Sequence, residues 1–229
     1  MGSKRIAVIG GFTLDEIIWG DNIYHSIGGG VYHSIKPFIN TPKYTFYVYS
    51  KGNRALIEKD LKNIDNIVLR ILDDTGIARF RLIYKSIGQR ILYLITPPPL
   101  IPDSMIPSEN YDAIIINPVY HEVPLTLLKK ARILSPVLSL DIQGFVRRVL
   151  NEEISISTGY TEEIMLYADI IHGNYNEVIG LYNCSSLEEL IKNVVMKNIF
   201  KNKIILISNG PDPIYLITGD NVLLFKPPK

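Results

Sequence analysis

The chain has 229 residues, which suits a single α/β domain over residues 1–229 with a core that needs no disulfide or metal. Its 24 lysine and arginine residues nearly balance 23 aspartate and glutamate residues, and a formal charge of +1 without a basic block excludes nucleic acid as an expected partner. One cysteine, no signal-peptide pattern and no apolar run of ~20 residues argue against a disulfide framework, secretion and a membrane partner, so we expect a cytoplasmic protein.

Short apolar segments alternate with helical patterns along the chain. The expected strands are residues 5–9, 44–49, 67–72, 113–116, 137–140, 169–171 and 204–207. Their apolar character is nearly continuous, as in strands that helices cover on both faces. The expected helices are residues 30–39, 54–62, 122–134, 160–167 and 186–198. The alternation predicts an α/β fold with a doubly wound, three-layer, mainly parallel sheet.

Two segments break this alternation. Residues 77–95 alternate apolar with polar side chains around a turn, as a β-hairpin with one solvated face does, and residues 15–27 alternate similarly. We expect both in a small β lid contributed by about residues 12–28 and 77–96. An apolar lid face, to which we assign Phe80, Leu82, Ile91 and Tyr93, would let two lids pair in a homodimer.

Glycines and a carboxylate follow the first strand and the first lid segment. Gly28, Gly29 and Gly30 precede a helix, where they either let a ligand approach the backbone or act as a hinge below the lid. Asp15 lies beyond the first strand, where open α/β sheets have their ligand crevice. Its carboxylate either accepts hydrogen bonds from sugar hydroxyls or is a solvated loop residue.

The stretch HGNYNE, residues 172–177, joins an expected strand to an expected helix. Asn174 and Glu177 have the spacing of a capping box, in which each side chain bonds a backbone N–H of the first turn. The same pair, at the carboxyl end of a parallel strand, would also suit water molecules around Mg²⁺. Spacing alone does not choose between these two roles.

The order of these features resembles the ribokinase-like (PfkB) family of carbohydrate and nucleoside kinases over nearly the whole chain. Residues 6–10 through Asp15 resemble the family's first strand and substrate-binding aspartate, and Gly28-Gly29 resembles its diglycine hinge. Asn174 to Glu177 matches the family's N-x-x-E motif, and residues 204–210 are similar to its strand ending in Thr-x-Gly. Residues 141–147 also resemble a segment of inositol-kinase-like members, although Asp141 and Arg147 would equally form a surface ion pair.

The resemblance implies phosphorylation of a hydroxyl on a sugar or related polyol, with ATP and Mg²⁺ as cofactors. The implied substrate-binding residues are Asp15, Gly28, Gly29, Gly30 and His33. The implied phosphate and metal region contains Asn174 and Glu177, with Glu177 acting on the metal through water, and the nucleotide would lie near Ser208 and Gly210.

Three positions depart from the family pattern. His33 stands where the family often has a sugar-contacting Asn, and His172 stands where a Lys is common. The sequence stops at Lys229, before the D-T-x-G-A-G-D segment that supplies the family's anion hole and catalytic base. The catalytic residue is therefore unknown, and we expect impaired activity. The alternative is a non-catalytic protein of the same fold that binds a sugar or a nucleotide.

Overall fold

The structure is a computed structural model that describes residues 2–61, 64–74, 76–86, 89–157, 163–196, 201–219 and 221–226. Parts of four predicted elements lie outside the described residues. These parts are residue 62 of one helix, the tip of the lid turn at 87–88, and the helix ends at 160–162 and 197–198.

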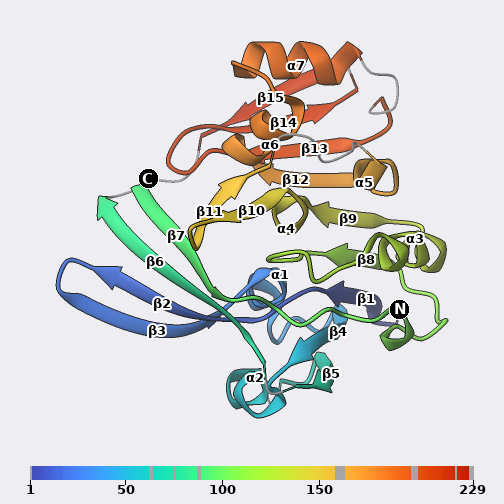
Figure 1. The fold of residues 1–229 in the computed structure, drawn as a ribbon. Coiled ribbons are helices and arrows are strands. Elements are labelled where there is room, and N and C mark those ends of the chain that lie inside the picture. Colours follow the sequence, from blue (N-terminus) through green and yellow to red (C-terminus); the bar gives the residue numbers. More distant parts are fainter. Residues whose placement is uncertain are drawn as a thin grey trace.

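The main sheet has nine strands, in the order β15-β14-β13-β12-β9-β8-β1-β4-β5 (Figure 1). Its parallel strands are β1 (Lys4–Ile9), β4 (Tyr44–Gly52), β5 (Ile67–Asp73), β8 (Ala113–Ile116), β9 (Leu138–Asp141), β12 (Ile170–Asn174) and β13 (Ile204–Ser208). An antiparallel hairpin of β14 (Ile214–Thr218) and β15 (Asn221–Phe225) extends one edge. All seven predicted strands are confirmed, and so is the mainly parallel sheet.

Helices pack on both faces of this sheet, which confirms the doubly wound prediction. On one face lie α1 (Gly30–Ile35) and α2 (Arg54–Leu61), whose Val31, Ile35, Ile57 and Leu61 pack against β1, β4 and β5. A larger core on the other face contains residues of α3 (Leu125–Leu134), α4 (Gln143–Val146), α5 (Glu163–Leu166), α6 (Tyr175–Tyr182) and α7 (Leu187–Met196). Two short 3-10 helices, η1 (Lys36–Phe38) and η2 (Asp103–Met105), complete the described helices. None of the helices in the described ranges is both long and apolar enough to cross a membrane.

Two predicted helices have different bounds from those expected. The stretch 30–39 is divided, because α1 ends at Ile35 and the 3-10 helix η1 contains Pro37 at its start. The stretch 122–134 begins later than expected, at Leu125, because the backbone at Pro124 is extended, with ψ at 157°. The short helix α4 was not predicted, since four residues are too few to show a helical period.

On the face of the main sheet that carries α1 and α2, helices of the described residues cover β1, β4 and β5 but not the other end of the sheet. Over β13 and β15 no helix of the described residues packs on this face, and Ile204, Leu223 and Phe225 remain 42%, 47% and 48% exposed. Cross-strand pairing places these residues on one side, because Leu206, Leu216 and Leu223 share one register position and side chains alternate along each strand. An apolar stripe therefore runs along this edge of the sheet.

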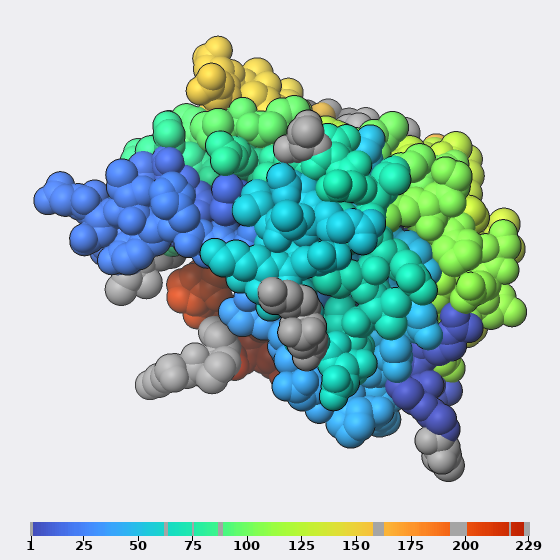
Figure 2. Space-filling view, turned by 90° about the horizontal axis from the view of Figure 1, so that it is seen from below, coloured from blue at the N-terminus to red at the C-terminus, as the bar shows by residue number. Residues whose placement is uncertain are grey.

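The second sheet contains both segments assigned to the lid. Its six strands have the order β10-β11-β7-β6-β2-β3. They are β2 (Thr13–Trp19), β3 (Asn22–Gly28), β6 (Ala78–Ser86), β7 (Gln89–Thr96), β10 (Arg147–Leu150) and β11 (Glu153–Ile156). The hairpin of β10 and β11 was not predicted, because each strand has only four residues. The β2–β3 hairpin, dark blue, projects from one side of the molecule (Figure 2).

The prediction that four lid residues form one apolar face is wrong. Leu82 pairs with Leu92 and Phe80 with Leu94, so these four side chains share a face, whereas Ile91 pairs with Ile83 on the opposite face. Phe80 and Leu82 are buried, at 4% and 8% exposure, against the body of the protein.

Candidate functional site

Two adjoining cavities lie where the carboxyl ends of the parallel strands meet the second sheet. The lid cavity, about 360 Å³, is lined by Thr13, Asp15, Gly29, Gly30, His33, Ser34, Phe80, Leu82, Arg90, Leu92, Asn117, Val119, Asp141, Gln143, Arg147 and His172. The loop cavity, about 760 Å³, is lined by Tyr84, Gln89, Arg90, Asn174, Tyr175, Asn176, Ser208, Asn209, Gly210, Pro211 and Asp212. Ligands of open α/β sheets bind at this edge of the strands.

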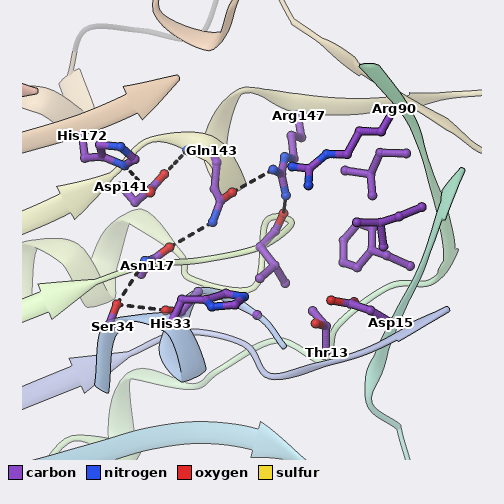
Figure 3. A pocket seen from close by; sticks show the side chains of 16 residues that line it. Thr13, Asp15, His33, Ser34, Arg90, Asn117, Asp141, Gln143, Arg147 and His172 are labelled. Atoms are coloured by element: carbon purple, nitrogen blue, oxygen red, sulfur yellow. Dashed lines mark hydrogen bonds and ion pairs between the residues drawn. The ribbon is translucent and has the colours of Figure 1, made fainter. Parts of the chain in front are cut away.

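Asp15 projects from β2 into the lid cavity, opposite the ends of the main strands (Figure 3). Burial raises the pKa of its carboxyl above the ordinary value, although the Thr13 hydroxyl and nearby positive groups oppose the shift. Asp15 Oδ1 and Thr13 Oγ1 are buried, and apart from the interaction of the Thr13 hydroxyl with the Asp15 carboxylate neither has a hydrogen-bond partner within the described residues. Since buried polar atoms are rarely left unpaired, the two oxygens suit a ligand with hydroxyl groups.

The three glycines bring the backbone close to its neighbours. A Cβ on Gly30 would lie 2.1 Å from the carbonyl oxygen of Asn117, and one on Gly28 would lie 2.4 Å from Asp15 Oδ2. Gly29 has φ at +96°, a left-handed conformation that side chains rarely adopt. Gly29 and Gly30 line the lid cavity, whereas Gly28 does not. The protein's own packing is thus enough to require small residues here, whatever ligand approaches.

A row of hydrogen bonds fixes the polar wall of the lid cavity (Figure 3). Asn117 Nδ2 donates to Ser34 Oγ at 3.1 Å, and Gln143 Nε2 donates to Asn117 Oδ1 at 3.0 Å. Arg147 Nη2 donates to Gln143 Oε1 at 2.7 Å, and Arg147 Nη1 donates to the carbonyl oxygen of Val119 at 3.1 Å. Three of these four bonds join residues 26 to 83 positions apart, so the spacing of residues in the sequence gave no signal for them, whereas Arg147 and Gln143 are four positions apart.

Arg147 connects this wall to the start of α6. Its Nη2 lies 3.5 Å from Glu177 Oε1, and the two side chains are only 11% and 3% exposed. The alternative in which Arg147 forms a surface ion pair with Asp141 is therefore wrong, because the Arg147 side chain is mostly buried and pairs with Glu177. Ser34, Asn117, Gln143, Arg147 and Glu177 therefore form one polar network, which reaches from the lid cavity to the edge of the loop cavity.

Asp141 instead pairs with His172 on the neighbouring strand. His172 Nδ1 lies 2.7 Å from Asp141 Oδ2, and Asp141 Oδ1 accepts a hydrogen bond from the Gln143 backbone N–H at 2.9 Å. Burial lowers the pKa of the His172 imidazole, but Asp141 raises it, and the net shift is upward. The contact at Nδ1 fixes the orientation of the imidazole ring and therefore the direction of its second nitrogen, Nε2.

Asn174 and Glu177 form the predicted capping box. Asn174 Oδ1 accepts from the Glu177 N–H at 2.9 Å, and Glu177 Oε2 accepts from the Asn174 N–H at 3.0 Å. Asn174 lines the loop cavity, but Glu177 lies beneath it and is 2% exposed. Burial raises the pKa of the Glu177 carboxyl, and Arg147 opposes that shift. Both carboxylate oxygens have protein partners and Glu177 does not line the loop cavity, which disfavours direct metal coordination.

Residues 208–212 form the far side of the loop cavity. Ser208 and Gly210 line the cavity, together with the loop that follows β13. Gly210 has φ at +58°, and a Cβ there would meet no atom within 4 Å, so its glycine serves the turn rather than close packing. Within the described residues no group of three or more His, Cys, Asp or Glu side chains is arranged to hold a metal ion.

Glu122 is a buried carboxylate that sequence reasoning missed. Its oxygens accept from the backbone N–H groups of Val119 at 2.7 Å and Tyr120 at 2.8 Å. Burial raises the pKa of this carboxyl, and these backbone donors and that of Gly11 oppose the shift. Glu122 thereby holds the loop after β8 against the loop after β1, which together form the floor of the site. A lone Glu in a loop carries no pattern that would have found it.

Solved structures similar to this chain include ribokinase-family kinases, and no family model and no curated protein matches the sequence. A sulfate complex of a pyrophosphate-dependent kinase in that family has a TM-score of 0.81 at 22% identity, over 96% of this chain and 78% of the other. A complex of a pyrophosphate-dependent kinase of the same family with a pyrophosphate analog and myo-inositol has a TM-score of 0.79 at 22% identity, with the same coverage. Ribokinase from Thermotoga maritima has a TM-score of 0.70 at 12% identity, over 99% and 78% of the two chains. The chain therefore has the ribokinase-like fold.

Proposed function

We propose that this protein of ribokinase-like fold transfers a phosphoryl group from ATP to a hydroxyl of a sugar or related polyol. The observation that carries the proposal is the pair of adjoining cavities at the carboxyl edge of the sheet. One cavity presents a buried carboxylate with an unpartnered oxygen, and the other lies at the first turn of α6 and is lined mainly by polar residues. The first set suits hydroxyl groups and the second suits phosphates.

In the proposed reaction the acceptor occupies the lid cavity and the donor phosphates occupy the loop cavity. The acceptor hydroxyl oxygen forms a bond to the γ-phosphorus while the bond from that phosphorus to the bridging oxygen breaks, and its electron pair leaves with ADP. The hydroxyl proton is released. Asp15 would orient the acceptor, with His33, Gly29 and Gly30 beside it, and Phe80, Leu82 and Leu92 would exclude water under the lid.

Asn174, Ser208 and Gly210 would bind the phosphate chain of the donor. The first turn of α6 adds its amides and the positive end of the helix dipole. Mg²⁺ would supply charge neutralisation on the phosphates, held mainly by phosphate oxygens and water. Because the Glu177 carboxylate is capped and paired, its contribution to the metal would be an electrostatic one from below the cavity.

Inorganic pyrophosphate is a second candidate donor. The structures with TM-scores of 0.79 and 0.81 belong to pyrophosphate-dependent kinases, one of them bound to myo-inositol. The residues that line the loop cavity are mostly polar, with aromatic rings only from Tyr84 and Tyr175. Such a site would hold two phosphates without requiring a slot for a purine. In that version the leaving group is inorganic phosphate instead of ADP.

We also propose a homodimer formed through the lid. The β2–β3 hairpin exposes Trp19 and Tyr24 on one face, at 46% and 57%, and Ile23 on the other face, at 60%, and a second lid would cover part of this apolar surface. Sedimentation at micromolar concentration should show a dimer that Ile23→Lys separates. A monomer at every concentration would contradict this part of the proposal.

The reaction is tested by measuring phosphoryl transfer from ATP and from pyrophosphate to a panel of sugars, inositols and nucleosides, with and without Mg²⁺. Release of ADP or phosphate that depends on both the acceptor and Mg²⁺ supports the kinase. Thermal stabilisation by an acceptor or a nucleotide without any turnover would instead support the alternative of a non-catalytic binding protein. Neither binding nor turnover with any compound would refute both.

A further inference from the structure

The boundary between the two cavities carries one cation. Of the described residues, Arg90 alone lines both the lid cavity and the loop cavity. It lies on β7 of the second sheet, in register with Tyr84 of β6. Figure 3 shows its side chain extending from the lid strand toward Arg147. A group that passes from one cavity to the other would pass this guanidinium.

Arg90 has few partners in the protein. Its Nη1 donates to the Tyr84 hydroxyl at 3.2 Å, and none of the described carboxylates lies within ion-pair distance of it. The side chain is exposed to the cavities. Most of its five N–H donors therefore point to no acceptor among the described residues. A guanidinium with free donors at the boundary of a site is well suited to bidentate contacts with oxyanions.

Other arginines near the lid have protein partners. Arg81 pairs with Glu16, Arg148 Nε donates to Ser155 Oγ at 3.2 Å, and Arg147 belongs to the polar network. Arg79 is exposed on β6 and lines neither cavity. Position and free donors together distinguish Arg90 from the rest.

The charge of Arg90 reaches the acceptor side of the site. It is one of the groups that oppose the upward shift of the Asp15 pKa, so its field extends into the lid cavity. Negative charge on a transferred phosphoryl spreads over three oxygens between the attacking and leaving oxygens. A preorganised cation at that point stabilises the transition state more than the bound substrates.

We infer that Arg90 is a catalytic residue that binds the phosphoryl group in transit, so that the lid supplies the cation as it covers the acceptor. The inference rests on the proposed function, because it concerns the same two cavities. The bonds that form and break are those of the transfer already described, and Arg90 neither gains nor loses a proton. Its guanidinium donates two hydrogen bonds to nonbridging phosphoryl oxygens.

Kinetics of Arg90→Ala, Arg90→Lys and the matched control Arg79→Ala test the inference. We expect Arg90→Ala to lower kcat by about 100-fold or more while the KM of the acceptor changes little, as for loss of one transition-state donor. Arg90→Lys should recover part of the rate, because it keeps the charge and loses the planar fork. Arg79→Ala should behave as the wild type. Equal kcat values for Arg90→Ala and Arg79→Ala would overturn the inference while leaving the proposed function intact.

A binding experiment tests the same residue without turnover. Trp19 is the one tryptophan of the chain, and its ring lies 5.3 Å from that of Tyr84, the partner of Arg90. Titration with inorganic pyrophosphate, followed by Trp19 fluorescence and by calorimetry, should give a Kd that Arg90→Ala weakens about 10-fold or more and Arg79→Ala leaves unchanged. Equal affinities in the two variants would overturn the inference even if no acceptor is ever found.

Discussion

The lid cavity and the loop cavity are built from different parts of the chain. Side chains from both sheets line the lid cavity, and hydrogen bonds between distant residues hold several of them. The loop cavity is formed mainly by two consecutive strand ends, the first turn of α6 and the loop around Gly210. In the proposed kinase, selection among acceptors would therefore depend on side chains from both sheets, whereas donor binding would depend on two strand ends and the loops that follow them.

The polar network joins the two cavities physically. Gln143 contacts Asn117 on the acceptor side, and Arg147 contacts Glu177 below the donor side. Substitutions in the two cavities and in this network test whether the two cavities, which are built differently, also differ in function. The expected effects below run from the largest to the smallest.

Asp15→Asn should have the largest effect and should be confined to the acceptor. Loss of charged hydrogen bonds, each worth ~1.5–3 kcal/mol, should lower kcat/KM for every acceptor by about 100-fold or more. The affinity for ADP or pyrophosphate should be unchanged, because Asp15 lines the lid cavity alone. Steady-state kinetics and calorimetry measure the two sides. A similar loss of donor affinity would show that the cavities are not separate in function.

Gln143→Ala should weaken both the fold and the acceptor side. It leaves Asn117 Oδ1 and one Arg147 donor without their partner, which should cost ~1–2 kcal/mol in the free energy of unfolding by urea. The KM of the acceptor should rise several-fold because the wall of the lid cavity loosens. Gln143→Glu keeps an acceptor for Arg147 and serves as the control. Full recovery by Gln143→Glu would show that the bond to Asn117 contributes little.

Asn174→Ala should affect the donor side and the stability of α6. Loss of the cap should cost ~1 kcal/mol in the free energy of unfolding, whereas Asn174→Ser retains a capping oxygen. Ser186 offers a matched control, because its Oγ accepts from the Glu189 N–H at 3.2 Å at the start of α7, away from both cavities. Ser186→Ala should lose similar stability without changing pyrophosphate affinity. Unchanged pyrophosphate affinity in Asn174→Ala would leave Asn174 with a structural role only.

The loop cavity was easier to predict from sequence than the lid cavity. Asn174, Ser208 and Gly210 are close to apolar strands in the sequence, so the strand pattern alone places them at the carboxyl edge. By contrast, Asn117 and Gln143 become neighbours only through sheet order. The lid was harder again, because its register shifts between Arg79 and Phe80 and a shift of one residue exchanges the two faces. Phe80 and Leu82 face the cavity while Ile91 does not, because Leu82 pairs with Leu92 and Ile91 therefore pairs with Ile83 on the opposite face, in a register that shifts again between Tyr84 and Ser86 near the turn.

The smallest expected effect concerns the stability of the unliganded lid cavity and its dependence on pH. Burial raises the pKa of Asp15 above 3.8, so its favourable contribution is fully present below pH 3.8 and is lost as the pH rises through the raised value. Asp15→Asn should therefore be more stable than the wild type at pH 7, by at most about 1 kcal/mol because the side chain is partly exposed.

Asp112 provides a control of opposite sign. A hydrogen bond from Lys4 lowers the pKa of its carboxyl, so its contribution is present above pH 3.8 and is lost as the pH falls through the lowered value. Asp112→Asn should therefore be slightly less stable than the wild type at pH 7. Urea unfolding at pH 4 and pH 7 measures both differences, and both should shrink at the lower pH. If Asp15→Asn proved less stable than the wild type at pH 7 without ligand, Asp15 would be part of the structural framework, and the contrast between its cavity and the backbone-built loop cavity would fail.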